Sequence, residues 1–244
     1  MFKNVIRIKF ILLILASVLL GFGADLQAEN GEWEYVFVSY LHGASLDGTV
    51  AVRGLEADVD VSFGDALENL EFGFQGHFEA RNEKWIILSD ITYMGLGAGT
   101  SAPPADIDFN QWVVEGGAGY RATENVDLLF GGRFNRLDAK INFQGPLGIK
   151  VEGDENWFDP YIGARLNLPL GERASVLVRG DIGGFGVGSD FAWTFTPSFV
   201  FRATEKMSFV AFYRFIDTDF KDDDTGFVFD VQTTGPGAGL AMHF

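Results

Sequence analysis

The feature that most constrains this chain is a period-two alternation of large apolar and polar residues, repeated over most of its length. Between Leu70 and Tyr93, phenylalanines recur at even positions, a polar break follows at Arg81–Lys84, and apolar residues then occupy odd positions from Trp85 onward. Such alternation indicates β-strands with one apolar face, because successive side chains of a strand point to opposite faces. The segment therefore predicts two antiparallel strands joined by a tight turn.

The same alternation recurs in eight further segments, so the sequence predicts ten strands. Each is long enough for a tilted membrane strand, which needs about 9–11 residues. A soluble sandwich would use shorter strands and hide the apolar faces inside. The predicted strands are centred on residues 33–38, 72–81, 85–93, 111–121, 126–135, 158–168, 176–182, 193–202, 209–215 and 227–232.

The lengths of the connectors between these segments predict the topology. Short connectors alternate strictly with longer ones, which is typical of outer-membrane barrels. We therefore expect an all-β protein: a transmembrane antiparallel up-and-down β-barrel of about ten strands, with short periplasmic turns, longer extracellular loops and both termini in the periplasm. The short connectors are 81–84, 122–125, 170–173 and 203–206, and the long ones are 43–69, 97–108, 144–156, 184–191 and 217–226.

The N-terminal segment has the composition of a secretory signal peptide. Basic Lys3, Arg7 and Lys9 precede an apolar run at 10–20 that is too short to cross a bilayer as a helix. We expect cleavage after Ala28, which leaves a barrel domain at 29–244. Cleavage would remove three of the 18 Lys and Arg residues and one of the 34 Asp and Glu residues, giving a net charge of −18.

Charge and composition exclude several classes of function. An acidic chain does not suit nucleic acid, whose binding depends on Lys and Arg contacts to phosphates. The absence of cysteine excludes disulfides, a thiol nucleophile and thiolate metal ligands. No cofactor is predicted.

Both ends of the barrel domain carry local signals. Leu240 and Met242 alternate up to a terminal Phe244, which is similar to the C-terminal signal read by the barrel assembly machinery. Apolar residues are odd-numbered at Phe229 but even-numbered at Phe244, so we expect a bulge near Thr234–Pro236. In the first long connector, 48–52 and 56–61 predict a small hairpin. A capping box at Ser62–Asp65 then predicts a short helix reaching about Asn69.

Several motifs are similar to those of a poorly characterised family of Gram-negative outer-membrane β-barrel proteins. They are Trp157–Pro160, Gly180–Ser189, Tyr213–Phe215, Gly235–Gly237, and Glu79–Arg81 together with Trp85 and Asp90. The resemblance covers nearly the whole predicted domain, and the glycine-rich stretch is its most specific part. It implies a barrel in the outer membrane and brings no activity or catalytic residue with it.

The polar faces of the predicted strands carry charged residues that should point into the lumen. Isolated charges there would be costly, so they are expected to pair. One interpretation is a packed salt-bridge network that fills and stiffens the barrel; the other is a charged constriction that selects solutes. The predicted set is Glu34, Glu79, Arg81, Asp90, Glu115, Asp127, Arg133, Arg165, Arg179, Asp181, Arg202, Arg214 and Asp230.

Catalysis has little support in the sequence. Of the three histidines, His77 is expected in the charge network and His243 at the periplasmic rim. His42 with Ser39 or Ser45 is the one arrangement that a barrel hydrolase could use. The glycines of 180–188 lack the Lys-Ser/Thr pair of a phosphate loop and are expected to mark close packing or a bend. We therefore predict a protein that is not an enzyme.

Residues 217–224 form an acidic loop. Asp217, Asp219, Asp222 and Asp224 could bind Ca²⁺, but the loop lacks the glycine and distal glutamate of an EF-hand, so a solvated loop is favoured. These carboxylates could also be bridged by divalent cations to lipopolysaccharide phosphates.

Two classes of function remain open. The first is a structural or narrow-pore, porin-like membrane protein with a charge-filled lumen. The second is a surface module whose long loops bind lipopolysaccharide, matrix or another barrel. A lipid-modifying hydrolase is a distant third. The predicted partners are outer-membrane lipid, lipopolysaccharide and the barrel assembly machinery.

Overall fold

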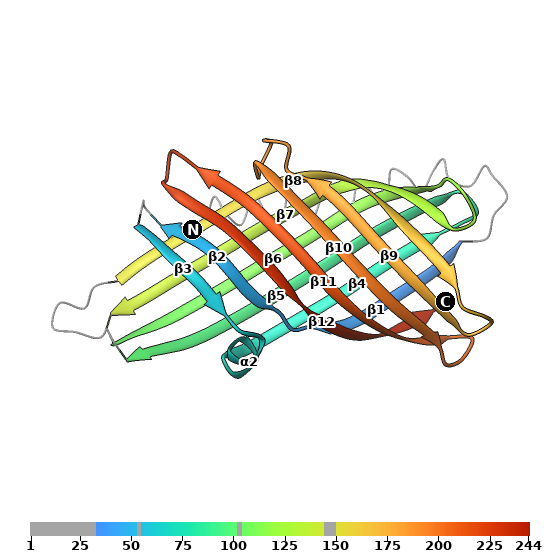
Figure 1. Cartoon of the computed structure of the whole chain (residues 1–244), viewed down its shortest axis with the longest axis horizontal. Coiled ribbons are helices and arrows are strands. Elements are labelled where there is room, and N and C mark those ends of the chain that lie inside the picture. Colours follow the sequence, from blue (N-terminus) through green and yellow to red (C-terminus); the bar gives the residue numbers. More distant parts are fainter. Residues whose placement is uncertain (1–32, 53–54, 102–103, 144–149) are drawn as a thin grey trace. The chain divides into compact units, whose positions relative to one another are not determined.

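The computed structural model describes residues 33–52, 55–101, 104–143 and 150–244, so the predicted signal peptide lies outside the described residues. These residues form one antiparallel sheet in which ten strands close into a ring, because β1 pairs with both β4 and β12 (Figure 1). The predicted ten-stranded up-and-down barrel is confirmed. Its strands are β1 (Glu34–His42), β4 (Leu70–Arg81), β5 (Trp85–Ser101), β6 (Pro104–Arg121), β7 (Val126–Phe143), β8 (Lys150–Pro169), β9 (Ala174–Gly183), β10 (Phe191–Arg202), β11 (Met207–Asp222) and β12 (Phe227–His243).

One end of the barrel, here called the turn end, holds the four short connectors and the C-terminus. These connectors, at 82–84, 122–125, 170–173 and 203–206, agree with the predicted turns. Local side-chain bonds close them: Asn82 Oδ1 accepts from the backbone N–H of Lys84 (2.9 Å) and of Trp85 (2.7 Å). At the same end, Phe244 N–H donates to the Tyr35 carbonyl at 3.0 Å, so the last residue helps to close the ring.

The opposite end, here called the extended end, contains more strand than the sequence predicted. Residues 97–101 and 104–108 of the loop expected at 97–108 belong to β5 and β6, and residues 150–156 of the loop expected at 144–156 belong to β8, while β7 runs to Phe143. Residues 102–103 and 144–149 of these loops lie outside the described residues. In Figure 1 these four strands continue to the left past the ends of β9 and β10. That part of the prediction was wrong, because the alternation weakens where the strands leave the apolar band.

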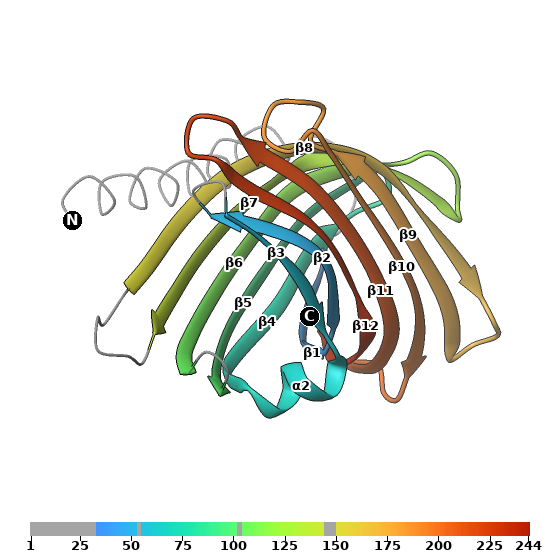
Figure 2. The ribbon, with the colours of Figure 1, turned by 60° about the vertical axis from the view of Figure 1, so that its left-hand side comes forward.

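The first long connector folds as predicted, with one addition. It contains β2 (Ser45–Val52), β3 (Leu55–Val61) and the short helix α2 (Phe63–Glu68), seen beside the barrel in Figure 2. Ser62 Oγ accepts from the backbone N–H of Asp65 at 3.2 Å, as in a capping box. The addition is that β2 continues the ladder of β1 along β12, so β12 pairs with β1 in one half and with β2 in the other.

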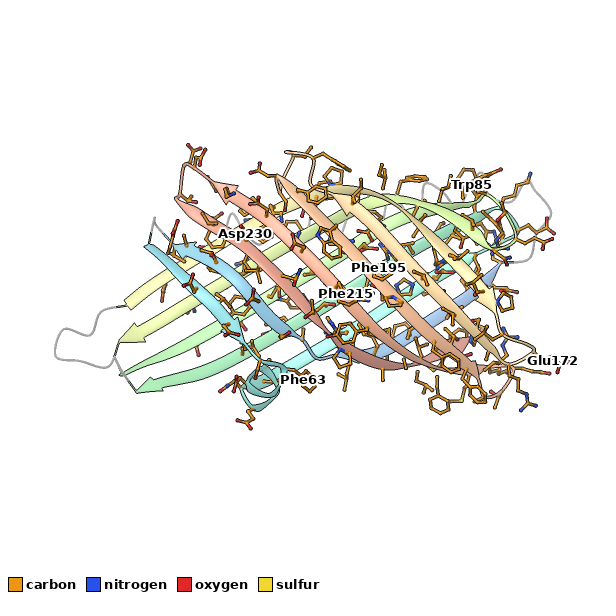
Figure 3. The ribbon with its side chains drawn as sticks, viewed as in Figure 1. Phe63, Trp85, Glu172, Phe195, Phe215 and Asp230 are labelled. Carbon is orange, nitrogen blue, oxygen red and sulfur yellow. The ribbon has the colours of Figure 1, made fainter. Side chains whose placement is uncertain are left out.

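Outward-facing aromatics define an apolar band around the ring. On β5 and β6, Trp85 packs on Tyr120 (5.3 Å between ring centroids) near the turn end, and Tyr93 packs on Trp112 (4.6 Å) further along. The rise per residue and a tilt near 40° place these two pairs about 21 Å apart along the barrel axis, close to the height of an outer-membrane apolar band. Figure 3 labels Phe195 and Phe215 on the same outward face. Within the described residues, no helix is both long enough and apolar enough to cross a bilayer.

Beyond this band the polarity of the two faces inverts without any change of register. Pairing between β11 and β12 is continuous from Met207↔Met242 to Asp222↔Phe227, so the predicted bulge near Thr234–Pro236 is wrong. The parity changes because Phe229 points inward, where it is 4% exposed, while Asp230 is exposed on the outward face. An apolar core therefore fills the barrel at the extended end; its buried members are Leu46, Leu137, Trp157, Phe220, Phe227, Phe229 and Val231.

Candidate functional site

The lumen inside the apolar band is occupied by paired charges, beginning at the turn end. Arg81 pairs with Glu34 (Nε–Oε2, 3.0 Å) at the mouth of the barrel, and with Glu79 at 3.9 Å. Deeper in, Arg165 donates to Glu79 (Nη2–Oε1, 3.1 Å) and pairs with Asp127 (3.0 Å). Glu79 and Asp127 thus each face a guanidinium, which offsets the cost of burying their charge.

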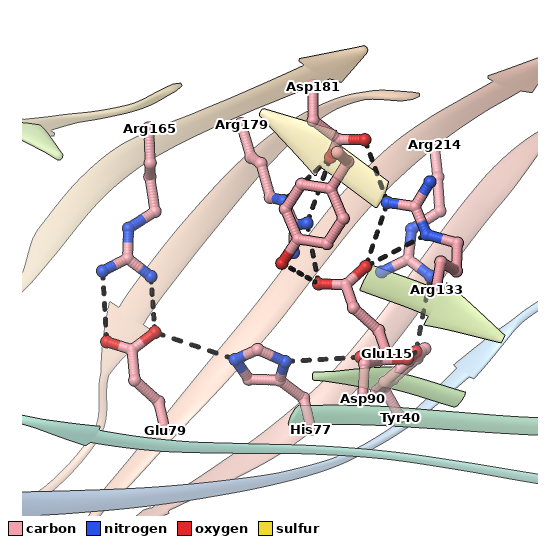
Figure 4. Close-up of polar contacts among 11 residues, drawn as sticks. Tyr40, His77, Glu79, Asp90, Glu115, Arg133, Arg165, Arg179, Asp181 and Arg214 are labelled. Atoms are coloured by element: carbon pink, nitrogen blue, oxygen red, sulfur yellow. Dashed lines mark hydrogen bonds and ion pairs between the residues drawn. The ribbon is translucent and has the colours of Figure 1, made fainter. Parts of the chain in front are cut away.

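The middle of the lumen holds a four-membered cluster from β6, β7 and β9. Arg133 pairs with Glu115 (3.0 Å) and Asp181 (2.9 Å), and Arg179 pairs with the same two carboxylates at 2.7 and 3.1 Å. Tyr161 donates its hydroxyl to Glu115 at 3.2 Å, and both guanidiniums lie over its ring. Figure 4 shows the contacts that join Glu115 and Asp181 to Arg133 and Arg179.

A second chain of polar contacts extends from Glu79 to Arg214. His77 lies between Glu79 (3.7 Å) and Asp90 (3.3 Å), which agrees with its expected place in the charge network. Tyr40 donates to Asp90 at 2.7 Å, and Arg214 Nη1 donates to the Tyr40 hydroxyl at 3.3 Å (Figure 4).

Two residues of the predicted lumen set stand apart from this network. Asp230 points outward, for the reason given above, and its assignment to the lumen was wrong. Arg202 is exposed at the turn end, and the ion pairs between described residues do not include it. Three further members of the network were not predicted: Tyr40, Tyr161 and Arg121, which pairs with Asp127 at 3.7 Å. The inward parity of the two tyrosines would have identified them.

Asp159 anchors the glycine-rich loop to β8 through neutral donors. Its carboxylate is 1% exposed and accepts from Asn135 Nδ2 (3.1 Å), Trp157 Nε1 (3.0 Å), and both the backbone N–H (2.7 Å) and hydroxyl (2.9 Å) of Ser189. The loop needs glycine at 188, where a Cβ would lie 2.4 Å from the Phe158 carbonyl oxygen. The close packing and bend expected of this glycine run are therefore present.

At the extended end, an open cleft separates β8 from β11. This β8 cleft has a volume of ≈ 440 Å³ and is lined by Asn156–Phe158 of β8, Val187 and Gly188 of the glycine loop, and Phe220–Asp224. Its floor is the stacked pair Trp157 and Phe220, whose ring centroids are 4.3 Å apart.

Carboxylates dominate the surface around the extended end. Burial and then the charges of Asp222 and Asp154 raise the pKa of the Glu155 carboxyl, which lies beside the cleft. Burial together with Asp230 and Asp219 likewise raises the pKa of Asp217 on the outward face. Lys221 is the basic residue of the cleft lining, and it already pairs with Asp219 at 2.9 Å. The region therefore carries uncompensated negative charge.

The predicted calcium ligands do not converge. Asp217 and Asp219 lie on the outward face of β11, whereas Asp222 Oδ1 accepts from the backbone N–H of Asp224 (2.9 Å) in the turn that follows. Among the described residues, no group of three or more His, Asp or Glu side chains is arranged to hold a metal ion.

The hydrolase arrangement considered for His42 is not formed. Ser39 is exposed on the outer face, and Ser45 Oγ bonds to Thr234 on β12. A Ser–His contact does occur between Ser208 Oγ and His243 Nε2 (2.9 Å), but Ser208 is 1% exposed, so a substrate could not reach its hydroxyl.

Comparison with known proteins finds similarity in fold but not in sequence family. No protein-family model matches the sequence, and neither does any curated protein. Similar solved structures include the outer membrane protease OmpT from Escherichia coli, with 11% identity, a TM-score of 0.50, and 90% of this chain and 100% of that chain covered. Another is Ail, the attachment invasion locus protein of Yersinia pestis, with 15% identity and a TM-score of 0.43. The match covers 88% of this chain and 100% of Ail. A third is Neisserial surface protein A, with 14% identity and a TM-score of 0.35. The match covers 88% of this chain and 100% of that protein.

The chain has the fold of outer-membrane β-barrel proteins, the class to which OmpT belongs. This agrees with the fold that the sequence motifs implied. At such low identity the likeness carries the fold alone. It transfers neither the protease activity named for OmpT nor any other role.

Proposed function

We propose that this protein is a non-conducting outer-membrane anchor that displays a rigid, acidic binding surface outside the cell. The membrane half serves as a sealed support, and the extended end is the functional part. This unites the structural role with the surface-binding role, both of which the sequence left open, and it rejects the narrow pore.

The observation that carries the proposal is the filling of the lumen at two successive levels. Ion pairs centred on Glu115 and Asp181 occupy the middle of the barrel, and the apolar core around Trp157 and Phe229 occupies the extended end. An ion path would need polar groups or water along its whole length, and the apolar core offers neither. Ten strands also give a barrel narrow enough for side chains to fill.

The orientation rests on the connectors and on charge. In outer-membrane barrels short turns are typical of the periplasmic side and long extensions of the outside, which supports an orientation with both ends of the barrel domain in the periplasm. The outward face of β2, β3, β11 and β12 carries carboxylates beyond the apolar band, at Asp47, Asp58, Asp60, Asp219 and Asp230. Such a surface repels polyanions, so lipopolysaccharide phosphates would need divalent cations as bridges, whereas basic partners bind it directly.

Planar-bilayer recording of the purified protein tests the sealed lumen. We expect no steady conductance from the wild type and none from Asp181→Ala, although that variant should be less stable. A stable wild-type channel whose selectivity shifts toward anions in Asp181→Ala would contradict the proposal and make the protein a selective pore.

A further inference from the structure

The outer half of β8 has one edge without a partner strand. Its pairing with β7 runs from Lys150 to Leu166, but its pairing with β9 starts only at Tyr161, because β9 ends at Gly183. In Figure 1, β8 runs on past β9 at the extended end. The segment Glu152–Phe158 is therefore an edge strand, and such an edge is a template for pairing with another chain.

The contacts of the glycine loop show which backbone groups point to this edge. Gly184 N–H donates to the Pro160 carbonyl at 3.1 Å, and Gly188 lies against the carbonyl of Phe158. Alternate residues of a strand direct their N–H and C=O groups to the same side. The N–H and C=O groups of Asn156 and Asp154 therefore point toward the β8 cleft, beyond the reach of the loop.

The facing wall of the cleft is also an edge. The last pair between β10 and β11 is Phe191↔Asp219, and the N–H of Asp190 donates to the Asp219 carbonyl at 2.8 Å. Beyond it, Phe220–Asp222 has no strand on the β10 side. An added strand could therefore lie between β8 and β11, where the wall of the barrel is incomplete.

The chemistry of the cleft defines its occupant. Asp222, Asp223 and Asp224 form one rim, and Asp154 and Glu155 belong to the opposite strand. Apolar contacts are available at Phe158, which is 50% exposed, and at Val187, which is 69% exposed. A segment that alternates basic and apolar residues matches both features, because one of its side-chain faces can lie on the Trp157–Phe220 floor while the other stays beside the exposed carboxylates.

We propose that the β8 cleft binds an extended basic segment of another polypeptide by strand addition, with backbone bonds to Asn156 and Asp154 and Lys or Arg side chains toward Asp222–Asp224. This rests on the proposed function, since it names the partner of the surface that the anchor displays. A second copy of this chain does not fit, because pairing two β8 edges would bring Glu152 and Asp154 against like charges.

The test uses the full barrel folded in detergent micelles and a fluorescently labelled peptide of alternating lysine and valine, with anisotropy as the measurement. Three peptides serve as controls: one alternating glutamate and valine, one with the same lysines and valines in two blocks, and one N-methylated at alternate residues. The N-methylated peptide keeps its charge but cannot donate backbone bonds to an edge. We expect only the alternating lysine–valine peptide to bind tightly, with affinity falling as salt rises.

Variants of the chain separate the two contributions. Asn156→Pro removes the N–H that faces the cleft and leaves the β7 ladder intact, so affinity should fall about tenfold, whereas Asn156→Val should stay within about threefold of wild type. Asp223→Asn with Asp224→Asn should also weaken binding about tenfold and flatten its salt dependence. The matched control, Glu83→Gln with Glu172→Gln, removes two exposed carboxylates from the short connectors at the turn end, away from the acidic surface, and should change nothing.

Several outcomes would overturn strand addition. Equal binding of the N-methylated or block peptide, or an unaffected Asn156→Pro variant that retains normal heat-modifiability, would leave only diffuse electrostatic attraction. A loss of affinity in the turn-end control would place binding elsewhere. Binding of Ca²⁺ alone at these carboxylates, with no peptide bound, would replace the peptide by a cation. A protein that is silent in bilayers and binds no peptide would overturn this inference and leave the anchor proposal standing.

Discussion

At the scale of single residues, the lumen is held by carboxylates that each serve two cations. Glu115 is 5% exposed and accepts from Arg133, Arg179 and Tyr161, so neither guanidinium is left unpaired in the middle of the barrel. Each ion pair of such a cluster adds little net stability. Removing one partner is nevertheless costly, because it leaves an uncompensated buried charge.

Glu115→Gln keeps the size and the acceptor oxygen of the side chain but removes its charge. We expect it to lower the free energy of unfolding by about 3–5 kcal/mol, since both arginines would then share Asp181 alone. The matched control is Glu34→Gln. Glu34 pairs with Arg81 at a similar distance, but its side chain is 67% exposed. That change should cost under about 1 kcal/mol. Urea unfolding in lipid vesicles measures the free energy of unfolding of both variants. Equal decreases would show that the buried cluster contributes no more to stability than the exposed pair does.

Sequence parity predicted most of the lumen residues, because a membrane strand must show lipid an apolar face. It failed at Asp230 for a physical reason. The rule that aromatics face outward holds only at the depth of the bilayer, and Phe229 lies beyond that depth. The partners of each charge could not be predicted either, since they depend on which strands lie opposite across the lumen, as Arg165 and Glu79 do.

At the scale of elements, β11 contains this inversion within a single strand. Its outward residues pass from Phe209, Tyr213 and Phe215 to Asp217 and Asp219 with no break in register. Its inward residues pass in the opposite sense, from Arg214 to buried Phe220. In the apolar band the outward face of β11 is apolar and its inward face is polar, and beyond the band the two are exchanged. This is expected when the surrounding solvent changes from lipid to water. The same inversion on β12 was predicted from the sequence as a bulge near Thr234–Pro236.

The glycine loop gives a prediction at the same scale. Asp159→Ala would leave the Ser189 N–H and hydroxyl without their acceptor, so the loop Gly184–Asp190 should open more often. A hydrogen bond to a charged acceptor contributes about 1.5–3 kcal/mol, so amide exchange at Ser189 should speed up by about ten- to a hundredfold. The weaker variant Ser189→Ala keeps the backbone bond and should have a smaller effect.

Hydrogen exchange followed by mass spectrometry measures this opening, and the buried Val231 on β12 provides the internal reference. Faster exchange at Ser189 with unchanged exchange at Val231 would confirm that Asp159 fastens the loop. Equal acceleration at both sites would mean that the whole barrel is destabilised, and no acceleration would mean that the glycines alone fix the loop.

At the scale of the whole molecule, ring closure depends on contacts between the two ends of the described chain. Val36↔His243 begins the pairing of β1 with β12, and Phe244 bonds to Tyr35 beyond it. The closed ring was predicted from the alternating strands and the alternating connector lengths, but the pairing of β12 with both β1 and β2 could not be predicted from the sequence. The role of Phe244 as an assembly signal stays a prediction, which the outer-membrane yield of a Phe244-deleted variant would test.

The orientation of the barrel decides whether the β8 cleft can meet a partner at all, and the absence of cysteine makes it easy to measure. Asp223→Cys places a single thiol at the extended end, and Glu124→Cys places one in an exposed short turn. On intact cells, a membrane-impermeant maleimide should label the thiol at 223 and spare the thiol at 124. Opening the outer membrane should then expose the thiol at 124 to the same reagent, which proves that it is reactive. Labelling of the thiol at 124 but not of the thiol at 223 on intact cells would show that the barrel has the opposite orientation. It would also place the acidic surface in the periplasm and remove the basis for an external partner.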